Sequence, residues 1–159
     1  METIHVLIVS DNQSDIEEIR NMLASSSGAM VRFHVESEMD YASALRSLVR
    51  NQYDVYLVDQ IIPNSQMSGV DLVKKANAGG CRSAALLLTT MPDEDIDWAA
   101  DDAGFAGHVN KHLDFQERTF RNAIRFAIQH NKDVTEVREQ LRELQRQVST
   151  LIQSFDRRG

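Results

Sequence analysis

The stretch YDVYLVDQIIPNSQMSG, residues 53–69, decides the fold prediction. Its apolar run VYLV, at residues 55–58, ends on a single carboxylate, Asp59, and a polar loop that closes on Gly69 follows. A short, continuous apolar run of this kind is typical of a strand buried on both faces. An acid at the end of such a strand serves either chemistry or the capping of a loop, and this stretch alone supports both interpretations.

Runs of strand length alternate with helical patterns on both sides of this stretch. Strands are predicted at residues 5–9, 30–36, 54–59, 83–90 and 106–111. Helices are predicted at residues 13–25, 41–51, 69–80 and 93–104, and from residue 115 onward. Strands joined by helical crossovers form parallel sheets with helices on both faces. The sequence therefore predicts an α/β fold with a five-stranded, doubly wound parallel sheet of the flavodoxin-like type.

The last part of the chain has a different pattern. Apolar residues recur there in alternating steps of three and four: Val134, Val137, Leu141, Leu144, Val148, Leu151 and Phe155. This spacing is typical of a coiled coil. We therefore divide the chain into a domain at residues 1–130 and an extended C-terminal amphipathic or coiled-coil helix at residues 131–159. We expect a homodimer through residues 134–155, and the alternative is a helix folded back onto the domain.

Composition and charge exclude several classes of protein. A formal net charge of −7 disfavours a direct nucleic-acid binder, which needs a basic face to neutralise phosphates. No apolar run approaches the roughly 20 residues that span a bilayer. The N-terminus has no basic flank or cleavage site typical of a targeting segment. The single cysteine, Cys81, excludes an intramolecular disulfide framework. We expect a cytoplasmic protein without membrane or nucleic-acid contacts.

Four polar residues follow the ends of predicted strands. Asp11 lies just after the first strand, Asp59 ends the third, Thr89 ends the fourth and Lys111 ends the fifth. Residues at the carboxyl ends of parallel strands converge on one edge of the sheet. Two neighbouring carboxylates need a cation, and Mg²⁺ suits oxygen ligands. A carboxylate beside this cation can attack a phosphoryl group, so the pattern favours phosphoryl-acceptor chemistry at Asp59.

Four segments carry a family resemblance. They are VLIVSDN (6–12), VYLVDQIIPNSQMSGVDLV (55–73), LLLTT (86–90) and AGFAGHVNKHLD (103–114). In this order, at these strand ends, the set resembles the signature segments of bacterial response-regulator receiver domains. The resemblance extends over roughly residues 4–130 and implies a module of two-component signalling rather than an enzyme with its own substrate.

The resemblance implies roles for single residues. Asp59 would be the phosphoacceptor and Asp11 a Mg²⁺ ligand, together with Asp59 and the backbone carbonyl of Ile61. Thr89 would be the hydroxyl that reaches the phosphoryl group, and Lys111 its charge partner. The phosphoryl group would come from a histidine kinase or phosphotransfer protein. The response would be a change in dimer or output-helix geometry, passed on to a possible downstream effector.

The chain also departs from the family pattern. Ser10 stands where the family usually has the first of two consecutive acids, and the loop at residues 63–69 is longer, with Ser68 in place of an acid. His108 fills a position in the fifth strand where an aromatic switch residue is common. These departures keep a second hypothesis open, a receiver-like dimerisation scaffold that does not depend on phosphorylation. A hydrolase is poorly supported, because no general base or substrate pocket can be identified.

Overall fold

The computed structural model describes residues 2–28, 30–63, 65–90, 104–112 and 114–158. The strands are β1 (Glu2–Val9), β2 (Val31–Glu38), β3 (Val55–Asp59), β4 (Ala84–Thr89) and β5 (Gly107–Asn110). The helices are α1 (Gln13–Ser26), α2 (Tyr41–Arg50), α3 (Gly69–Ala78) and α5 (Glu117–Arg158). The helix predicted for residues 93–104 lies outside the described residues except for Gly104.

The five strands form one parallel sheet in the order β2-β1-β3-β4-β5. The central strand β3 pairs with β1 on one side and β4 on the other, with Val58 opposite Val9 and Leu87. All residues of β3 and β4 are buried, as their apolar runs predict. The predicted five-stranded, doubly wound parallel sheet is therefore confirmed.

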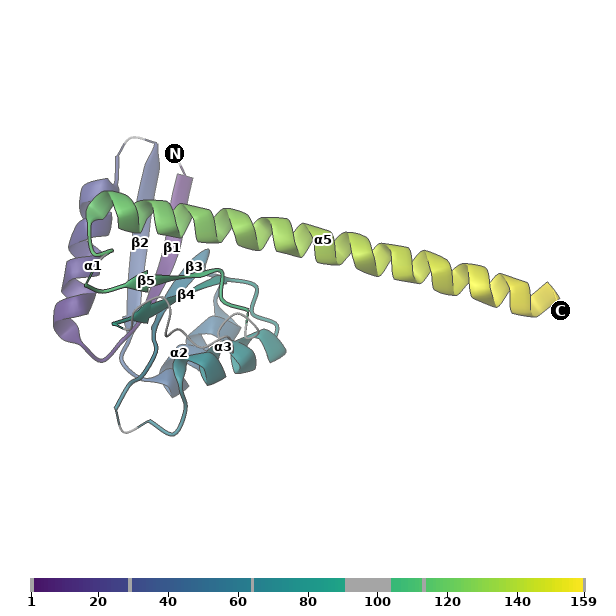
Figure 1. Cartoon of the computed structure of the whole chain (residues 1–159), viewed down its shortest axis with the longest axis horizontal. Helices are drawn as coiled ribbons and strands as arrows, with labels where there is room; N and C mark the ends of the chain where they lie inside the picture. The colour runs from purple at the N-terminus through teal and green to yellow at the C-terminus, as the bar shows by residue number, and fades with distance from the viewer. Residues whose placement is uncertain (1, 29, 64, 91–103, 113, 159) are drawn as a thin grey trace.

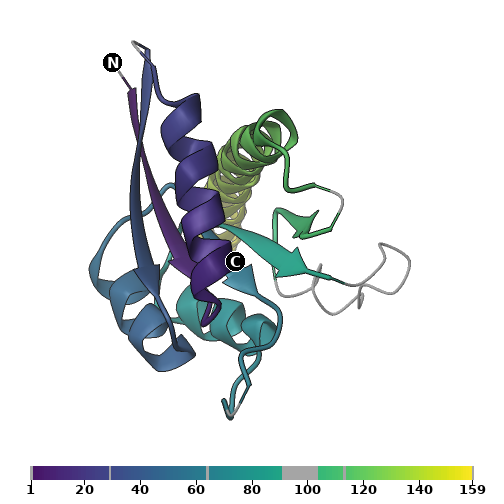
Figure 2. The same ribbon diagram turned by 90° about the vertical axis from the view of Figure 1, so that its left-hand side faces the viewer.

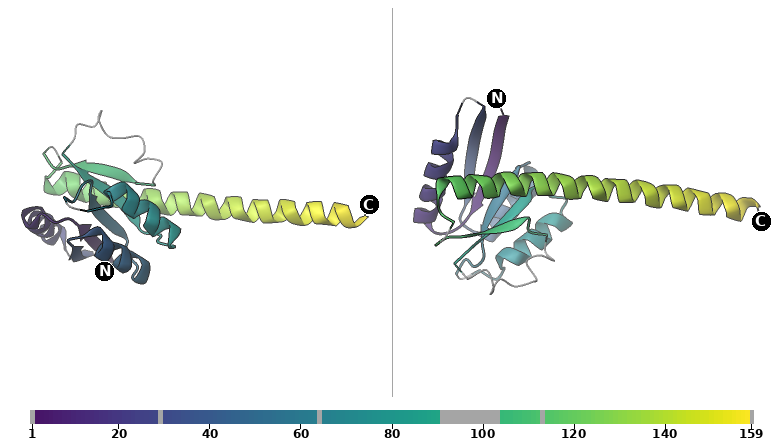
Figure 3. Two further views of the ribbon diagram at one scale, coloured as in Figure 1. Left: turned by 90° about the horizontal axis from the view of Figure 1, so that it is seen from below. Right: turned by 45° about the horizontal axis from the view of Figure 1, so that its top comes forward.

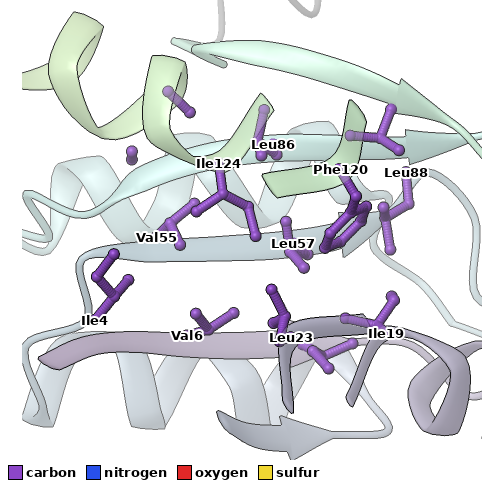
Figure 4. Close-up of a cluster of buried hydrophobic side chains, with 14 of the residues drawn as sticks. Ile4, Val6, Ile19, Leu23, Val55, Leu57, Leu86, Leu88, Phe120 and Ile124 are labelled. Atoms are coloured by element: carbon purple, nitrogen blue, oxygen red, sulfur yellow. The ribbon is translucent and has the colours of Figure 1, made fainter. Parts of the chain in front are cut away.

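Helices cover both faces of this sheet (Figures 1 and 2). The first face packs against α1 and α5, and Figure 4 shows Val6, Val55 and Leu57 pointing toward Leu23 and Ile124 of these helices. A second apolar cluster lies between the other face and the helices α2 and α3. The side-chain alternation along each strand supplies one cluster or the other, which fixes the register of the sheet.

Helix α5 is buried near its start and exposed over residues 136–157. Near its start Phe120, Ile124 and Ala127 are fully buried against the sheet and α1. From residue 136 to residue 157 every side chain is exposed, and Figures 1 and 3 show the helix projecting beyond the domain. The alternative of a helix folded back onto the domain is therefore wrong. Since α5 is unbroken across residue 130, the boundary placed there stays a prediction.

Polar side chains cap the N-termini of α1 and α2. Asn12 caps α1 by accepting from the Asp15 amide at 3.1 Å, and Asp40 caps α2 by accepting from the Ser43 amide at 2.8 Å. Such caps satisfy amides that lack helical partners. In the described part of the chain, no helix has the length and hydropathy needed to cross a bilayer.

Candidate functional site

The carboxyl ends of β1, β3, β4 and β5 form one polar edge of the sheet, which we call the rim. Four of its residues are Ser10, Asp59, Thr89 and Lys111, each at or just after the end of its strand. Ser10, Asp59 and Thr89 are buried, at 0%, 4% and 2% exposure. Since a buried polar side chain is costly unless it is bonded, the partners of each residue define what the rim can do.

Asp59 is held by a donor at each carboxylate oxygen. The Lys111 ammonium forms an ion pair with Oδ1, and the Ser10 hydroxyl donates to Oδ2. Burial raises the pKa of the Asp59 carboxyl above its ordinary value, although the bonds from Lys111 and Ser10 act in the opposite direction. A carboxylate with reduced solvation and a fixed orientation is well placed to act as a nucleophile.

Lys111 bridges two carboxylates rather than one. Its Nζ lies 2.8 Å from Oδ2 of Asp15, in addition to its ion pair with Asp59. The Lys111 and Asp15 side chains are each 17% exposed. Burial alone would lower the pKa of Lys111, but the bonds to Asp15 and Asp59 raise it, so the ammonium stays charged.

Thr89 is bonded to a residue that follows Asp59. Its hydroxyl Oγ1 donates to Oε1 of Gln60 at 2.9 Å. The backbone amide of Gln60 donates to the carbonyl of Leu88 at 3.1 Å. Two hydrogen bonds, one between side chains and one between backbones, therefore join the ends of β3 and β4. The hydroxyl that the family resemblance assigns to the phosphoryl group is thus engaged with a neighbouring side chain.

Tyr41 fixes the backbone of Asp59 from the second face of the sheet. Its side chain is 1% exposed, and its hydroxyl donates to the Asp59 carbonyl at 2.7 Å. Burial raises the pKa of this hydroxyl, and the charges of Asp59 and Asp11 raise it further. Both carboxylates therefore act on the same hydroxyl, although Asp11 itself is exposed.

The loop after Asp59 closes tightly on Gly69. The Gly69 amide donates to the Gln60 carbonyl at 3.1 Å, and a Cβ on Gly69 would lie 2.8 Å from the Asp59 carbonyl oxygen. Ser68 caps α3 in a capping box with Asp71, with bonds of 3.2 and 3.0 Å. The departure at Ser68 therefore has a structural explanation, the start of α3.

The residues of the rim fit a divalent cation of the Mg²⁺ type. In the described part of the chain, no three His, Cys, Asp or Glu side chains gather into a metal cluster. Mg²⁺ needs fewer protein ligands, because it keeps several waters and uses one or two carboxylates. Each Asp59 oxygen has one donor and retains further acceptor capacity, and Asp11 is exposed toward solvent. The Ile61 side chain is a hydrocarbon without a donor atom, so only the backbone carbonyl of this residue could bind the cation.

Sequence reasoning missed three residues of the site: Asp15, Gln60 and Tyr41. Asp15 lies in the first turn of α1, which starts at the rim, so its position in the sequence is sufficient to predict that it lies near the rim. The contacts of Gln60 and Tyr41 depend on side-chain direction, which no spacing rule provides. His108, considered as a switch position, is exposed in β5.

Comparisons with solved structures show the same fold. The chemotaxis protein CheY4 of Vibrio cholerae is 21% identical with a TM-score of 0.66, and the match covers 79% of this chain and 98% of that one. The receiver domain of a modulated diguanylate cyclase from Desulfovibrio desulfuricans is 22% identical with a TM-score of 0.68, covering 82% and 98%. The receiver domain of a sensor histidine kinase from Pseudomonas aeruginosa, with a magnesium ion in its active site cleft, is 23% identical with a TM-score of 0.66, covering 79% and 98%.

Family membership rests on the sequence match. The comparison with curated proteins gave no match. Residues 6–125 match the family described as response regulator receiver domain, which is well over half of the 159 residues. The predicted resemblance is thereby confirmed, and it places the protein among signalling modules rather than classical enzymes. The chain belongs to the response regulator receiver domains of two-component signalling.

Proposed function

We propose that Asp59 is the phosphoacceptor of this receiver domain and that it takes the phosphoryl group from a histidine kinase or phosphotransfer protein. The observation that carries the proposal is the pair of donors on its buried carboxylate, Lys111 at Oδ1 and Ser10 at Oδ2. A strand-end aspartate that only capped a loop would accept from nearby backbone amides, as Asp40 does at the start of α2.

Asp11, Asp59 and the carbonyl of Ile61 would hold Mg²⁺ at the rim. When bound, the cation polarises the phosphoryl oxygens and offsets their charge. The magnesium ion in the cleft of the Pseudomonas aeruginosa relative supports this assignment. Among the residues of this chain, Asp11 contributes an accessible charge and Asp59 contributes both a ligand oxygen and the nucleophile.

The transfer itself forms one bond and breaks another. An oxygen of Asp59 attacks the phosphorus atom, and the P–N bond to the donor histidine breaks with its electron pair passing to the ring nitrogen. Lys111 and Ser10 hold the carboxylate in place during the attack. Lys111 then neutralises part of the charge on the phosphoryl oxygens.

The response would start at Thr89. A phosphoryl group adds about −1.5 to −2 charges and three acceptor oxygens. These oxygens compete with Oε1 of Gln60 for the Thr89 hydroxyl, which now donates to Gln60 at 2.9 Å. Movement of Thr89 toward Asp59 would release Gln60 and shift the end of β4 against β5.

Incubation with Mg²⁺ and a small phosphodonor such as acetyl phosphate tests the proposal by intact mass. The expected result is a mass gain of one phosphoryl group in the wild type. No gain is expected when EDTA is present or in Asp59→Asn. Asp54→Asn is a matched control, because Asp54 precedes β3 at its other end and accepts from the His5 amide at 2.8 Å. No mass gain, or a gain that survives Asp59→Asn, would refute the proposal.

A homodimer through residues 134–155 forms the second part of the proposed function. The apolar stripe is exposed there, with Val137 at 63%, Leu144 at 57% and Leu151 at 60%. Each of these side chains would be buried in a coiled coil, and the full burial of one Leu stabilises by about 1.5–3 kcal/mol. The stripe could relay a change at the rim to an effector, since α5 begins beside β5 and packs on the domain.

The heptad composition favours a parallel pair of helices. Two of the four a positions are β-branched (Val134 and Val148, beside Leu141 and Phe155) and two of the three d positions are leucine (Leu144 and Leu151, beside Val137), which is close to the arrangement that favours parallel dimers. In parallel register, Asp133 at a g position faces Arg138 at the following e position of the other copy. This pairing places opposite charges together, which the antiparallel arrangement does not require.

One observation favours the alternative of a scaffold independent of phosphorylation. The stripe is exposed along α5 while each Asp59 oxygen already has a donor in the unphosphorylated form, so pairing needs no prior change at Asp59. Under this hypothesis, Asp59→Asn leaves both the dimer and the binding of any effector unchanged. Under the phosphoacceptor hypothesis, phosphorylation changes effector binding and Asp59→Asn abolishes that change.

A further inference from the structure

Asp15 adds a carboxylate to the rim from a helix. It lies in the first turn of α1, and its Oδ2 accepts from Nζ of Lys111 at 2.8 Å. The two side chains belong to positions 96 residues apart and are each 17% exposed. Lys111 therefore reaches both Asp15 and Asp59, so the ammonium is shared between a helix and a strand end.

Ser10 puts a neutral side chain in the rim, at a position where the family usually has an acid. It is fully buried, its hydroxyl donates to Asp59 and accepts from the Asn12 amide at 3.1 Å. A serine at this position cannot draw the ammonium of Lys111 away from Asp59. Asp15 can, because it presents a full negative charge to the same Nζ atom.

We propose that Asp15 is a positioning residue that supplies the carboxylate missing at Ser10. Its role is to hold Lys111 in position and to keep the net charge of the rim negative enough to bind a divalent cation. The inference rests on the proposed phosphoacceptor role of Asp59. With Asp11, Asp15 and Asp59 against Lys111, the rim has a formal net charge of −2. The same total would result from an acid at position 10 and a neutral residue at position 15.

The loss of Asp15 has a predictable effect on the electrostatics. Without it, Lys111 would neutralise Asp59 alone and leave Asp11 as the only uncompensated charge. A unit charge roughly 8 Å from a divalent cation changes its binding by about sixfold at the dielectric constant of water and by about a thousandfold at an effective dielectric constant of about 20, so we take about tenfold, near the lower limit, for this partly exposed site. Asp15 raises the cation affinity of the rim through its charge and by positioning the Lys111 ammonium, and it is not itself a ligand of the cation.

A purely structural role for Asp15 makes a different prediction. An acid in the first turn stabilises a helix through the helix dipole, and the Asp15 amide is capped by Asn12. Glu17 lies on the same helix and is exposed, without a contact to Lys111. If Asp15 only stabilised α1, its neutralisation would lower the melting temperature and leave the cation affinity of the folded protein unchanged.

Binding of Mn²⁺, used as the probe for the cation site and followed by electron paramagnetic resonance, separates the two roles in the full chain. We expect Asp15→Asn to weaken Mn²⁺ binding about tenfold, by the charge effect above. Glu17→Gln, which removes the same charge from the same helix, should change it by less than about twofold, because exposed charges are screened. Equal Mn²⁺ affinities of Asp15→Asn and Glu17→Gln would overturn the inference.

Transposing the charge gives a second test. The double variant Ser10→Asp with Asp15→Asn restores the formal charge of the rim, and we expect it to recover most of the lost Mn²⁺ affinity. A double variant that folds by circular dichroism and does not recover affinity would overturn the inference. If it does not fold, the comparison of Asp15→Asn with Glu17→Gln decides alone. Phosphorylation of the wild type, measured separately, shows whether a failure concerns Asp15 or the function of Asp59.

Discussion

The rim and the projecting part of α5 place opposite kinds of side chain in opposite surroundings. At the rim, polar groups such as Asp59 and Thr89 are buried, and they form hydrogen bonds with specific side chains, Ser10 and Gln60. Along residues 136–157 of α5, apolar groups are exposed, and their regular spacing is the main signal. In the first region the identity of each residue matters, whereas in the second the pattern does.

This difference has a consequence for substitutions. A small change at the rim disturbs bonds that have no substitute, because water has little access. A substitution on the polar face of α5 alters side chains that stay solvated, so it should have almost no effect on the stability of the fold. Only the apolar stripe of α5 should be sensitive, and its sensitivity should appear in association rather than in the fold.

The largest expected effect is the loss of the dimer in Leu144→Glu. Leu144 lies at a d position and is 57% exposed in the single chain, so the fold tolerates a charge there. In a coiled coil the same charge would be buried, and we expect dissociation to increase on the order of a hundredfold or more. Sedimentation equilibrium should give the mass of a monomer.

Gln153→Glu is the matched control for this variant. It adds the same charge to the same helix, at an f position away from the stripe, and should leave the dimer intact. A dimer that persists in Leu144→Glu would show that the copies associate through another surface, and the comparison between the two regions would fail on the helix side.

A smaller effect is expected at the rim in Gly69→Ala. The added Cβ would lie 2.8 Å from the Asp59 carbonyl oxygen and 3.1 Å from Cγ1 of Val58, so the backbone beside the acceptor must shift. We expect a loss of about 1–3 kcal/mol in the free energy of unfolding, as for other overpacked sites. Urea denaturation measures this loss, and slower phosphorylation should accompany it.

Gly28→Ala provides the control for Gly69→Ala. A Cβ on Gly28 would have nothing within 4 Å, so the variant should be neutral or slightly stabilising. If both variants behave alike, the close approach of α3 to Asp59 has no energetic consequence, and the rim is less tightly constrained than its geometry indicates.

The smallest effect concerns the ion pair where α5 leaves the domain. Arg82 and Glu139 are 3.8 Å apart, and their side chains are 74% and 61% exposed. Glu139→Gln should change the free energy of unfolding by less than about 0.5 kcal/mol, because exposed pairs contribute little. A loss of more than about 1 kcal/mol in urea denaturation would show that this pair fixes the direction of α5 after all.

The sequence predicted the elements whose pattern is continuous and missed contacts that depend on three-dimensional placement. Apolar runs located all five strands, and strand-end polarity located Asp59 and Lys111, because the topology of a parallel sheet brings such ends together. The bond between Asp15 and Lys111 joins residues 96 positions apart, and no periodicity encodes it. The sequence shows Ser10 in place of an acid, but the hydrogen bond from Ser10 to Asp59 depends on side-chain placement that the sequence pattern does not encode.

Helix α5 shows the same limit in another form. Its heptads were visible from Val134 onward, but the same helix also supplies Phe120 and Ile124 to the core. The periodicity of an amphipathic helix identifies an apolar face without showing what covers it. The sequence therefore left the projecting and folded-back arrangements open, and the structure decided between them.

Chemical mapping of the phosphoryl group tests the central claim most directly. Borohydride reduces an acyl phosphate on aspartate to homoserine, so the chain is phosphorylated with acetyl phosphate and Mg²⁺, reduced, digested and sequenced by mass spectrometry. The account predicts homoserine at position 59 alone, and none when EDTA replaces Mg²⁺. Homoserine at Asp11 or Asp15 instead of Asp59, or at no position, would contradict it.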